Sequence, residues 1–393
     1  MISIFNYRNI VLILLISFII LPIGNYSQDA KFDSLVTAGI NQIYNIKFDA
    51  AEKTYETMGK EYPLHPAAKF FDAMIIWWKI MLDQKNEEYD EIFEDKLEEV
   101  IDFCEEILDE DENNVDAIFF KGGALGFRGR LYSIRQEWFD AALDGKDALP
   151  LVYEAFKIDS TNEDVKLGFG IYNYYAEAIP EKYPFIKPAM IFFPSGDKVK
   201  GIKQLEAAAE KSKYAGIESQ FFLMNLYYQF ENDYDKALVY ADKLNKQFPD
   251  NPIFQKYVGR IFVKKSNYTK ACEIFENIKG KCDSNMNGYN DLLLRESNYY
   301  LGVNYMQKNL LDSAQVKFKD CANLSIILDE ENDEESGFQV NSVLYLGKIA
   351  GQTGNTELAR EYYNQILEMR DYSNSHKKVE RYLEKLDKKK AGD

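Results

Sequence analysis

Apolar and polar residues in the stretch 300–318 follow the period of an α-helix, in two runs that a polar break separates. Leu301, Gly302 and Tyr305 share one helical face in the first run. After the polar residues 307–309, Ala314 and Phe318 share a face one turn apart. Gly302 and Ala314 are 12 residues apart, and small residues at this separation let two antiparallel helices approach closely. The stretch therefore predicts a helical hairpin.

The same pair of small residues recurs along the chain with the same spacing of 12. The further pairs are Gly39 with Ala51, Gly259 with Ala271, and Gly347 with Ala359, and Asn225 with Ala237 is a looser copy. Ala237 and Ala271 are 34 residues apart, and the next intervals of 43 and 45 each equal 34 plus a polar loop. A hairpin this short cannot bury its apolar face alone, so the recurrence predicts a stack of hairpins.

This pattern resembles the tetratricopeptide repeat (TPR) family, which has small residues at positions 8 and 20 of a 34-residue unit and a large residue at position 24. Pro63 and Pro249 match the proline that the family places near position 32. The resemblance implies an all-α fold, an α-solenoid of about eight helix-turn-helix TPR-like repeats with a C-terminal capping helix. We expect one superhelix over 29–393, with clear repeats at about 31–64, 218–251, 252–285, 295–328 and 340–373, and degenerate repeats at 67–110, 115–160 and 163–213.

The repeat at 115–160 is the least ordinary one. Its first helix holds four glycines, and each costs about 1 kcal/mol relative to Ala in a helix interior. These are Gly122, Gly123, Gly126 and Gly129. Close packing against a neighbouring helix is the favoured explanation, and the close approach of a ligand or a loop is the alternative. The nearby Arg128, Arg130 and Arg135 are expected to be internal ion-pair struts, with Glu137, Asp140 and Asp144 as available partners.

The repeat at 163–213 is interrupted by an apolar insertion at 180–196. Three prolines predict that no helix forms before Met190, and Asp197 is expected to cap a helix at 199–213. Such an apolar segment should not lie bare in water. It is expected either to fold into the superhelix groove against the glycine-rich helix or to act as a hydrophobic docking element. The block 121–228 resembles a TPR type of exported bacterial proteins and, more distantly, the Iml2 and TTC39-like proteins.

The first 28 residues predict a secretory signal peptide. Arg8 precedes an apolar run over 10–21 that is too short for a spanning helix. We therefore expect an exported protein, periplasmic or secreted, with no membrane span after signal cleavage. The remaining chain has 64 acidic and 46 basic residues, because only Arg8 is lost from the 47, which gives a net charge of −18. This charge disfavours nucleic acid and anionic membranes as partners.

Four cysteines are spread along the chain. Cys104 and Cys321 fall on apolar helix faces and are expected to be small core residues. A disulfide between Cys282 and either Cys272 or Cys321 is left open, because sequence does not determine connectivity.

Catalysis has little support in the sequence. With only two histidines, the chain lacks material for histidine-based triads and zinc sites. Acidic residues are scattered along solvent faces, so an enzyme that uses a carboxylate pair is the weakest hypothesis. We predict no catalytic residue, no cofactor and no metal site.

Recognition of a partner has better support. In TPR proteins the first helix of each unit lines a concave groove, and the corresponding positions here form a basic stripe of Lys256, Arg260 and Lys264. The further partner-binding candidates are Tyr299, Asn341, Lys348, Phe222, Leu226 and Phe230. The stripe is suited to a carboxylate or an acidic peptide. An intramolecular balance of the stripe against Glu296 or the acidic loop 329–335 is equally open.

The sequence therefore predicts a non-catalytic scaffold that binds a protein or peptide in the cell envelope. The alternative is a binder of an apolar small molecule or lipid under the insertion. The oligomeric state is left open.

Overall fold

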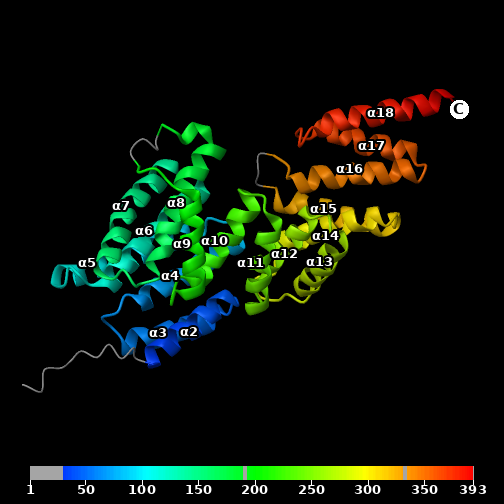
Figure 1. The fold of residues 1–393 in the computed structure, drawn as a ribbon. Helices are drawn as coiled ribbons and strands as arrows, with labels where there is room; N and C mark the ends of the chain where they lie inside the picture. The colour runs from blue at the N-terminus through cyan, green and yellow to red at the C-terminus, as the bar shows by residue number, and fades with distance from the viewer. Residues whose placement is uncertain (1–29, 189–192, 331–333, 393) are drawn as a thin grey trace, which may run out of the picture.

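This computed structural model describes residues 30–188, 193–330 and 334–392 of the chain, and the predicted signal segment 1–28 lies outside them. Within these ranges every regular element is a helix (Figure 1). Antiparallel helices pair in sequence order and stack into an elongated solenoid, with α18 at one end, α5 and α7 at the other, and α2 and α3 along its lower side. The predicted all-α solenoid is confirmed.

Eight hairpins and a final helix make up the solenoid. The first four pairs are α2 (Ala30–Tyr44) with α3 (Phe48–Glu61), α4 (Ala67–Leu82) with α5 (Asp90–Glu110), α6 (Val115–Arg135) with α7 (Trp138–Ile158), and α8 (Val165–Lys182) with α9 (Lys198–Lys211). The next four are α10 (Gly216–Gln229) with α11 (Tyr234–Gln247), α12 (Pro252–Lys264) with α13 (Tyr268–Asp283), α14 (Asp291–Gln307) with α15 (Leu311–Leu328), and α16 (Gly337–Gln352) with α17 (Thr356–Glu368). The last helix is α18 (Ser375–Gly392).

Four of the five clear repeats close by a glycine that faces an aromatic ring, and the α10–α11 repeat has Asn225 at that position. A Cβ atom added to Gly302 would lie 2.8 Å from Cε1 of Phe318, and one added to Gly259 would lie 2.9 Å from Cζ of Phe275. Gly347 faces Tyr363 in the same way. The expected contact between two small residues is therefore a contact between a glycine and the aromatic residue 16 positions later. The missing side chain makes room for a ring.

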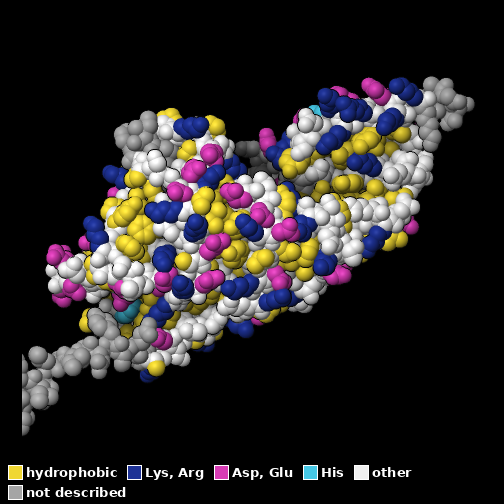
Figure 2. Space-filling view, in the orientation of Figure 1, with side chains coloured by type: hydrophobic (Ala, Val, Ile, Leu, Met, Phe, Trp, Pro, Cys, Tyr) yellow, Lys and Arg dark blue, Asp and Glu magenta, His cyan; other side chains and the backbone are white. Residues whose placement is uncertain are grey.

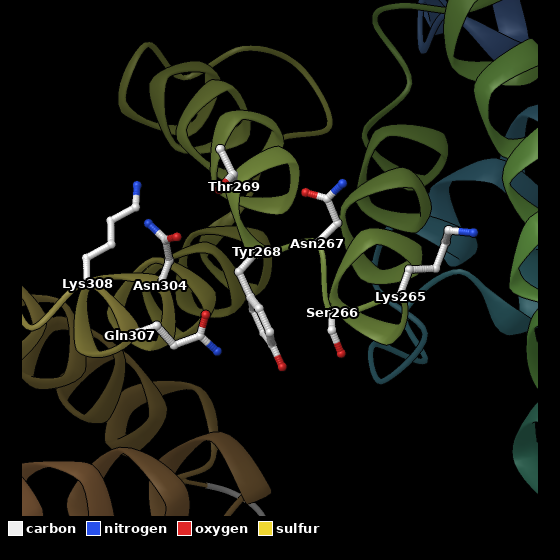
Figure 3. Close-up of a pocket in the computed structure, with 8 residues that line it drawn as sticks. All are labelled: Lys265, Ser266, Asn267, Tyr268, Thr269, Asn304, Gln307 and Lys308. Atoms are coloured by element: carbon white, nitrogen blue, oxygen red, sulfur yellow. The ribbon is translucent and has the colours of Figure 1, made fainter.

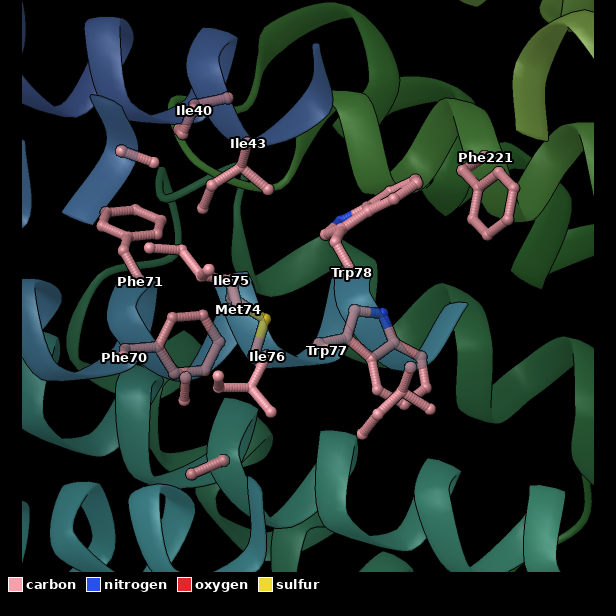
Figure 4. Close-up of a cluster of buried hydrophobic side chains, with 14 of the residues drawn as sticks. Ile40, Ile43, Phe70, Phe71, Met74, Ile75, Ile76, Trp77, Trp78 and Phe221 are labelled. Atoms are coloured by element: carbon pink, nitrogen blue, oxygen red, sulfur yellow. The ribbon is translucent and has the colours of Figure 1, made fainter. Parts of the chain in front are cut away.

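The helices from α2 to α12 share one hydrophobic core, which spans the interior of the superhelix (Figure 4). Trp78 of α4 lies at its centre, with ring centroids 4.9 Å from Tyr44 of α2, 6.0 Å from Phe221 of α10 and 5.6 Å from Phe254 of α12. Because α4 is apolar on every side except one charged side, it packs on its neighbours and across the superhelix at once. In this part of the molecule the inner face is mostly core.

The glycine-rich helix α6 shows three tight positions and one open one. Added Cβ atoms at Gly122, Gly123 and Gly129 would lie 3.2–3.4 Å from atoms of Leu151, Phe70 and the α7 backbone. One at Gly126 would have no neighbour within 4 Å. Close helix packing thus accounts for three of the four glycines.

The three arginines of α6 form ion pairs, as expected, but mostly with other partners than those nearby in sequence. Arg128 pairs with Asp144 at 2.8 Å and with Glu98, Arg135 with Asp90, and Arg130 with Glu218. Apart from Asp144, these carboxylates belong to other repeats.

The insertion begins later than predicted, because α8 continues through Pro180 to Lys182. Pro180 stands in the last turn, where the absent N–H removes a single backbone hydrogen bond. A short 3-10 helix, η1 (Pro184–Ile186), follows. The segment that follows the insertion lies along α8, where Tyr172 donates a hydrogen bond to the carbonyl of Pro194 at 2.5 Å. Asp197 caps α9 by accepting from the backbone N–H of Lys200, as predicted.

Phe185 of the insertion is 68% exposed, and the apolar residues 189–192 lie outside the described residues. The expected plug against α6 is therefore not seen among the insertion residues that are described.

All four cysteines are free thiols. Cys104 and Cys321 are fully buried core residues, as predicted. Burial raises the pKa of Cys282 and of Cys321 to about 11, so both are protonated at neutral pH.

Candidate functional site

The apolar candidates on and beside α10 lie in two environments. Leu226 is fully buried in the hydrophobic core that α2 to α12 share. Phe222 is half-buried, with the guanidinium carbon of Arg130 4.6 Å from its ring centre. Phe230 contacts Tyr175 at a centroid distance of 5.4 Å, and the ammonium of Lys182 lies 4.2 Å from its ring centre. Leu226 is therefore a packing residue, whereas Phe222 and Phe230 keep some surface towards solvent.

A charged cluster of Arg130, Glu218 and Tyr44 lies at one edge of this surface. Glu218 of α10 accepts a hydrogen bond from Arg130 of α6 and another from the Tyr44 hydroxyl of α2 at 3.0 Å. The Arg130 guanidinium also lies over the ring of Trp77, at 4.8 Å. Burial raises the pKa of Tyr44, and the neighbouring Glu218 carboxylate raises it further, so the hydroxyl remains a donor. Each partner is satisfied, and the cluster joins three repeats that are distant in sequence.

Arg260 of α12 and Glu296 of α14 form a two-pronged ion pair. Nε of Arg260 donates to Oε1 of Glu296 at 2.5 Å, and Nη2 donates to Oε2 at 2.6 Å. Burial alone would raise the pKa of Glu296, but the facing guanidinium outweighs it and holds that pKa below its ordinary value. Glu296 is thus ionised, and both of its oxygens are occupied.

Lys256 lies one turn before Arg260 on the same face of α12 and is half-buried. It forms no hydrogen bond or ion pair with any residue that the structure describes. Burial, and next the like charge of Arg260, lower the pKa of Lys256 to about 8, although Glu296 opposes the shift. Two cations here face a single carboxylate, so this part of the groove keeps a net positive charge.

Tyrosines surround this charge. The hydroxyl of Tyr257 donates a hydrogen bond to Oδ1 of Asn225 at 2.7 Å, and its ring lies 5.5 Å from that of Tyr228. The pKa of Tyr228 is raised to about 12 by burial, and that of Tyr300 is raised by burial and by Glu296. The hydroxyls of Tyr228 and Tyr300 therefore keep their protons at physiological pH.

The other predicted candidates are separate from this cluster. Lys264 is exposed at the end of α12. Tyr299 packs between repeats against the rings of Phe318, Phe338 and Tyr345. Lys348 lies over the ring of Tyr345 at 4.8 Å. Asn341 is half-buried on α16. The structure thus brings Lys256 and Arg260 together with Glu296, and leaves the remaining candidates along the same solenoid.

The kinds of side chains on the surface differ between the two ends of the molecule (Figure 2). Acidic and basic side chains are mixed over the larger body, and a hollow separates this body from the lobe of α16 to α18. In that lobe apolar side chains alternate with lysines and arginines.

Two cavities lie away from the charged cluster. One of about 470 Å³ lies at the turn between α12 and α13 and at the end of α14, lined by Lys265, Asn267, Tyr268 and Lys308 among other polar residues (Figure 3). The other, of about 220 Å³, lies between α2 and the turn before α10. Neither adjoins the described residues of the insertion. Within the described ranges no three His, Cys, Asp or Glu side chains are grouped to hold a metal ion.

Sequence reasoning missed the cluster of Arg130, Glu218 and Tyr44, because its members come from three repeats. One signal was present. The helix at 67–82 is apolar except for three charged residues along one side, which indicates that its other sides are covered by other helices.

Among the described residues, no helix has both the length and the apolarity to cross a membrane. No protein-family model and no curated protein sequence matches the chain.

Several solved structures resemble the chain at low identity. One is Pseudomonas aeruginosa pilF, with 12% identity over 66% of this chain and 97% of that one, at a TM-score of 0.43. Another is yeast Tom70, with 11% identity over 91% and 89% of the two chains, at 0.36. A third is the C-terminal part of a TPR repeat-containing protein from Cytophaga hutchinsonii, with 16% identity over 76% and 96%, at 0.34. The fold assignment itself rests on the helix pairs described above.

Proposed function

We propose that this protein is a non-catalytic scaffold of the cell envelope that binds an acidic peptide segment of a partner protein in the groove between α10 and α14. Lys256 carries the proposal. Its ammonium group is half-buried and unpaired among the described residues, and such a cation is costly unless an anion neutralises it. A carboxylate of the ligand would supply that anion through a charge-assisted hydrogen bond.

The surroundings of Lys256 indicate the order of residues in the ligand. Arg260 is held in place and neutralised by Glu296, so the charge left for the ligand is that of Lys256. Towards α8 the groove becomes aromatic at Tyr175, Phe222 and Phe230. A peptide with apolar residues at one end and acidic residues at the other fits this sequence of surfaces.

Fluorescence polarisation with two labelled peptides tests the proposal. One peptide carries four Leu or Phe residues followed by four Glu, and the other has Lys in place of Glu. We expect the acidic peptide to bind wild type, and Lys256→Glu to weaken it about 10-fold or more, in proportion to the loss of a charge-assisted hydrogen bond. Lys243→Glu, which makes the same charge change at an exposed position on α11, is the matched control. Equal affinities of the two variants would contradict the proposal.

The predicted extent of the site and the location of the protein have tests of their own. Lys264→Glu should weaken the acidic peptide only if the basic stripe continues to the end of α12. For export, we expect the mature N-terminus to begin after residue 28, as N-terminal sequencing of the envelope fraction would show. A protein that retains Met1 there would contradict cleavage.

A further inference from the structure

The turns of the first two hairpins lie against the turns that precede α12 and α14, more than 200 residues later in the chain. Nδ2 of Asn251 donates to the carbonyl of Tyr44 at 2.9 Å, across 207 positions. Nδ2 of Asn287 donates to the carbonyl of Ile46 at 2.8 Å, across 241 positions. Lys47 and Asp250 add an ion pair at 3.6 Å. The start of the superhelix is therefore joined to its later repeats.

Asn290 extends the same contact to the second hairpin. Its Nδ2 donates to the carbonyl of Leu82 at 3.3 Å. At the other end of its amide, Oδ1 accepts from the backbone N–H of Leu293 and caps α14. Asn251 does the same for α12, because its Oδ1 accepts from the N–H of Ile253 at 2.9 Å. Asparagine suits both tasks, since its side chain carries an acceptor and a donor, whereas Ser, Thr or Asp would keep only the cap and leave the distant carbonyl without this amide partner.

Ile46 shows that this contact determines the local backbone. The turn between the two helices of a hairpin often contains a residue with positive φ. In the later hairpins this residue is of a type that tolerates positive φ better than a β-branched residue does. These residues are Gln136, Asn232, Ser266, Asn309 and Gly354. In the first hairpin it is Ile46, at φ 59°, which is unfavourable for a β-branched residue.

The side chain of Ile46 compensates for the strained backbone. It is only 2% exposed and lies beside Gly288, which Pro252 and Leu82 also approach. Gly288 itself has φ 82°, and a Cβ atom there would lie 3.0 Å from Cγ2 of Ile46. The turn therefore keeps an unfavourable conformation because it places this side chain between the two parts of the superhelix.

We propose that these contacts form a clasp that positions the peptide groove. The clasp consists of Asn251, Asn287 and Asn290 on one side and the turns at 44–47 and 82–85 on the other. Asn251 caps the helix that carries Lys256 and Arg260, and Asn290 caps the helix that carries Glu296. By binding both helix starts to α2 and α4, the clasp sets the separation of α12 and α14 at the groove. Its effect on ligand binding rests on the proposed function, whereas its effect on the superhelix does not.

The double variant Asn251→Asp and Asn290→Asp tests the clasp. At each position aspartate keeps the capping oxygen, removes the amide donor that reaches the distant carbonyl, and places a carboxylate towards that carbonyl. We expect unchanged helix content by circular dichroism. Hydrogen–deuterium exchange of the α2 and α4 amides should become about 10-fold faster or more, and small-angle scattering should give a larger radius of gyration. The acidic peptide described above should bind several-fold more weakly, although Lys256 and Arg260 are unchanged.

Asn267→Asp is the matched control. Asn267 caps α13 by accepting from the N–H of Lys270, and among the described residues its amide donates to no distant carbonyl. We expect its α2 exchange, radius of gyration and peptide affinity to equal those of wild type. Ile46→Asn is a second variant: Asn tolerates positive φ, but the apolar side chain is lost and an amide is buried in its place. It should change the same measurements in the same direction.

The outcomes separate the two proposals. Wild-type exchange in α2 and α4 for both the double variant and Ile46→Asn would overturn the clasp. Faster exchange with unchanged peptide affinity would overturn its positioning role. If wild type itself fails to bind the acidic peptide, the proposed function fails, and the exchange and scattering results still decide whether the clasp joins the two parts of the superhelix.

Discussion

The helices from α2 to α12 and those from α13 to α18 are built from the same hairpin, yet they bury their apolar residues differently. In the first region one core runs through the interior of the superhelix, and rings of α2, α4, α10 and α12 meet there. In the second region the buried residues form separate clusters between successive hairpins. The first region resembles a globular domain in its packing, and the second a linear array.

The inner faces of the first helices of the hairpins account for this difference. On α4 the inner face carries Trp78, which only other apolar groups can cover. On α16 it carries Asn341 and Lys348, which remain partly exposed. A solenoid thus closes on itself where its inner face is apolar and stays open where that face is polar. The charged groove at Lys256 lies where the two regions meet.

The largest expected effect comes from Trp78→Ala, which removes the ring at the centre of the first region. We expect a loss of about 3–5 kcal/mol in the free energy of unfolding, measured by urea denaturation. Because the core is shared, hydrogen–deuterium exchange should quicken in α2, α10 and α12 together. Tyr363→Ala in the second region is the comparison, with faster exchange confined to α16, α17 and α18. If the effect of Trp78→Ala stayed within α3 to α6, the two regions would not differ as described.

Glu296→Gln tests the junction between the regions. It leaves Arg260 and Lys256 buried without a carboxylate, so we expect a loss of about 3 kcal/mol at pH 7. The pKa of Glu296 is lowered in the folded state, so the wild-type pair stabilises the fold above the ordinary carboxyl pKa and loses that contribution as the pH falls through the folded-state value. Stability measured from pH 7 to pH 3 should therefore fall more steeply for wild type than for the variant. Parallel curves would contradict a strong pair.

Two glycine substitutions compare hairpin closure with an open helix surface. Gly302→Ala should lose about 1–3 kcal/mol, because its Cβ would meet the Phe318 ring at 2.8 Å. Gly126→Ala in α6 should gain about 0.5–1 kcal/mol, because nothing lies within 4 Å and Ala is the better helix former. Thermal unfolding followed by circular dichroism measures both. A destabilised Gly126→Ala protein would indicate that the open position has a role beyond the helix.

Lys256→Met should stabilise the protein at neutral pH by about 1–2 kcal/mol, although it should weaken binding of the acidic peptide. Folding lowers the pKa of Lys256 from 10.5 to about 8, so the unfolded chain holds more protons between these values. Wild-type stability should therefore rise as the pH increases from about 8. The advantage of the variant should shrink over that range. Denaturant titrations at pH 7, 8 and 9 measure this, and a constant difference would rule out a costly buried ammonium group.

Much of the fold could be predicted from the sequence. The pair Gly302 and Ala314 located a hairpin, and its recurrence located the others, because each hairpin depends on contacts between residues within about two turns of the connecting loop. The basic stripe brought Lys256 and Arg260 to one helix face, and Glu296 was one of two intramolecular partners that the sequence left open beside an external ligand. The sequence did not show which of the two cations Glu296 would neutralise, since that depends on the offset of α12 against α14.

The sequence by itself determined the hairpins, their number and the face that each helix buries, because the helical period and the spacing of small and aromatic residues are local properties. Only the tertiary structure decided that the first region closes around Trp78, that Asn251 and Asn290 reach turns some 207 and 208 residues away, and that Lys256 has no ion-pair partner among the described residues. These contacts depend on the small rotation between successive hairpins, summed over several repeats. No local pattern records that sum.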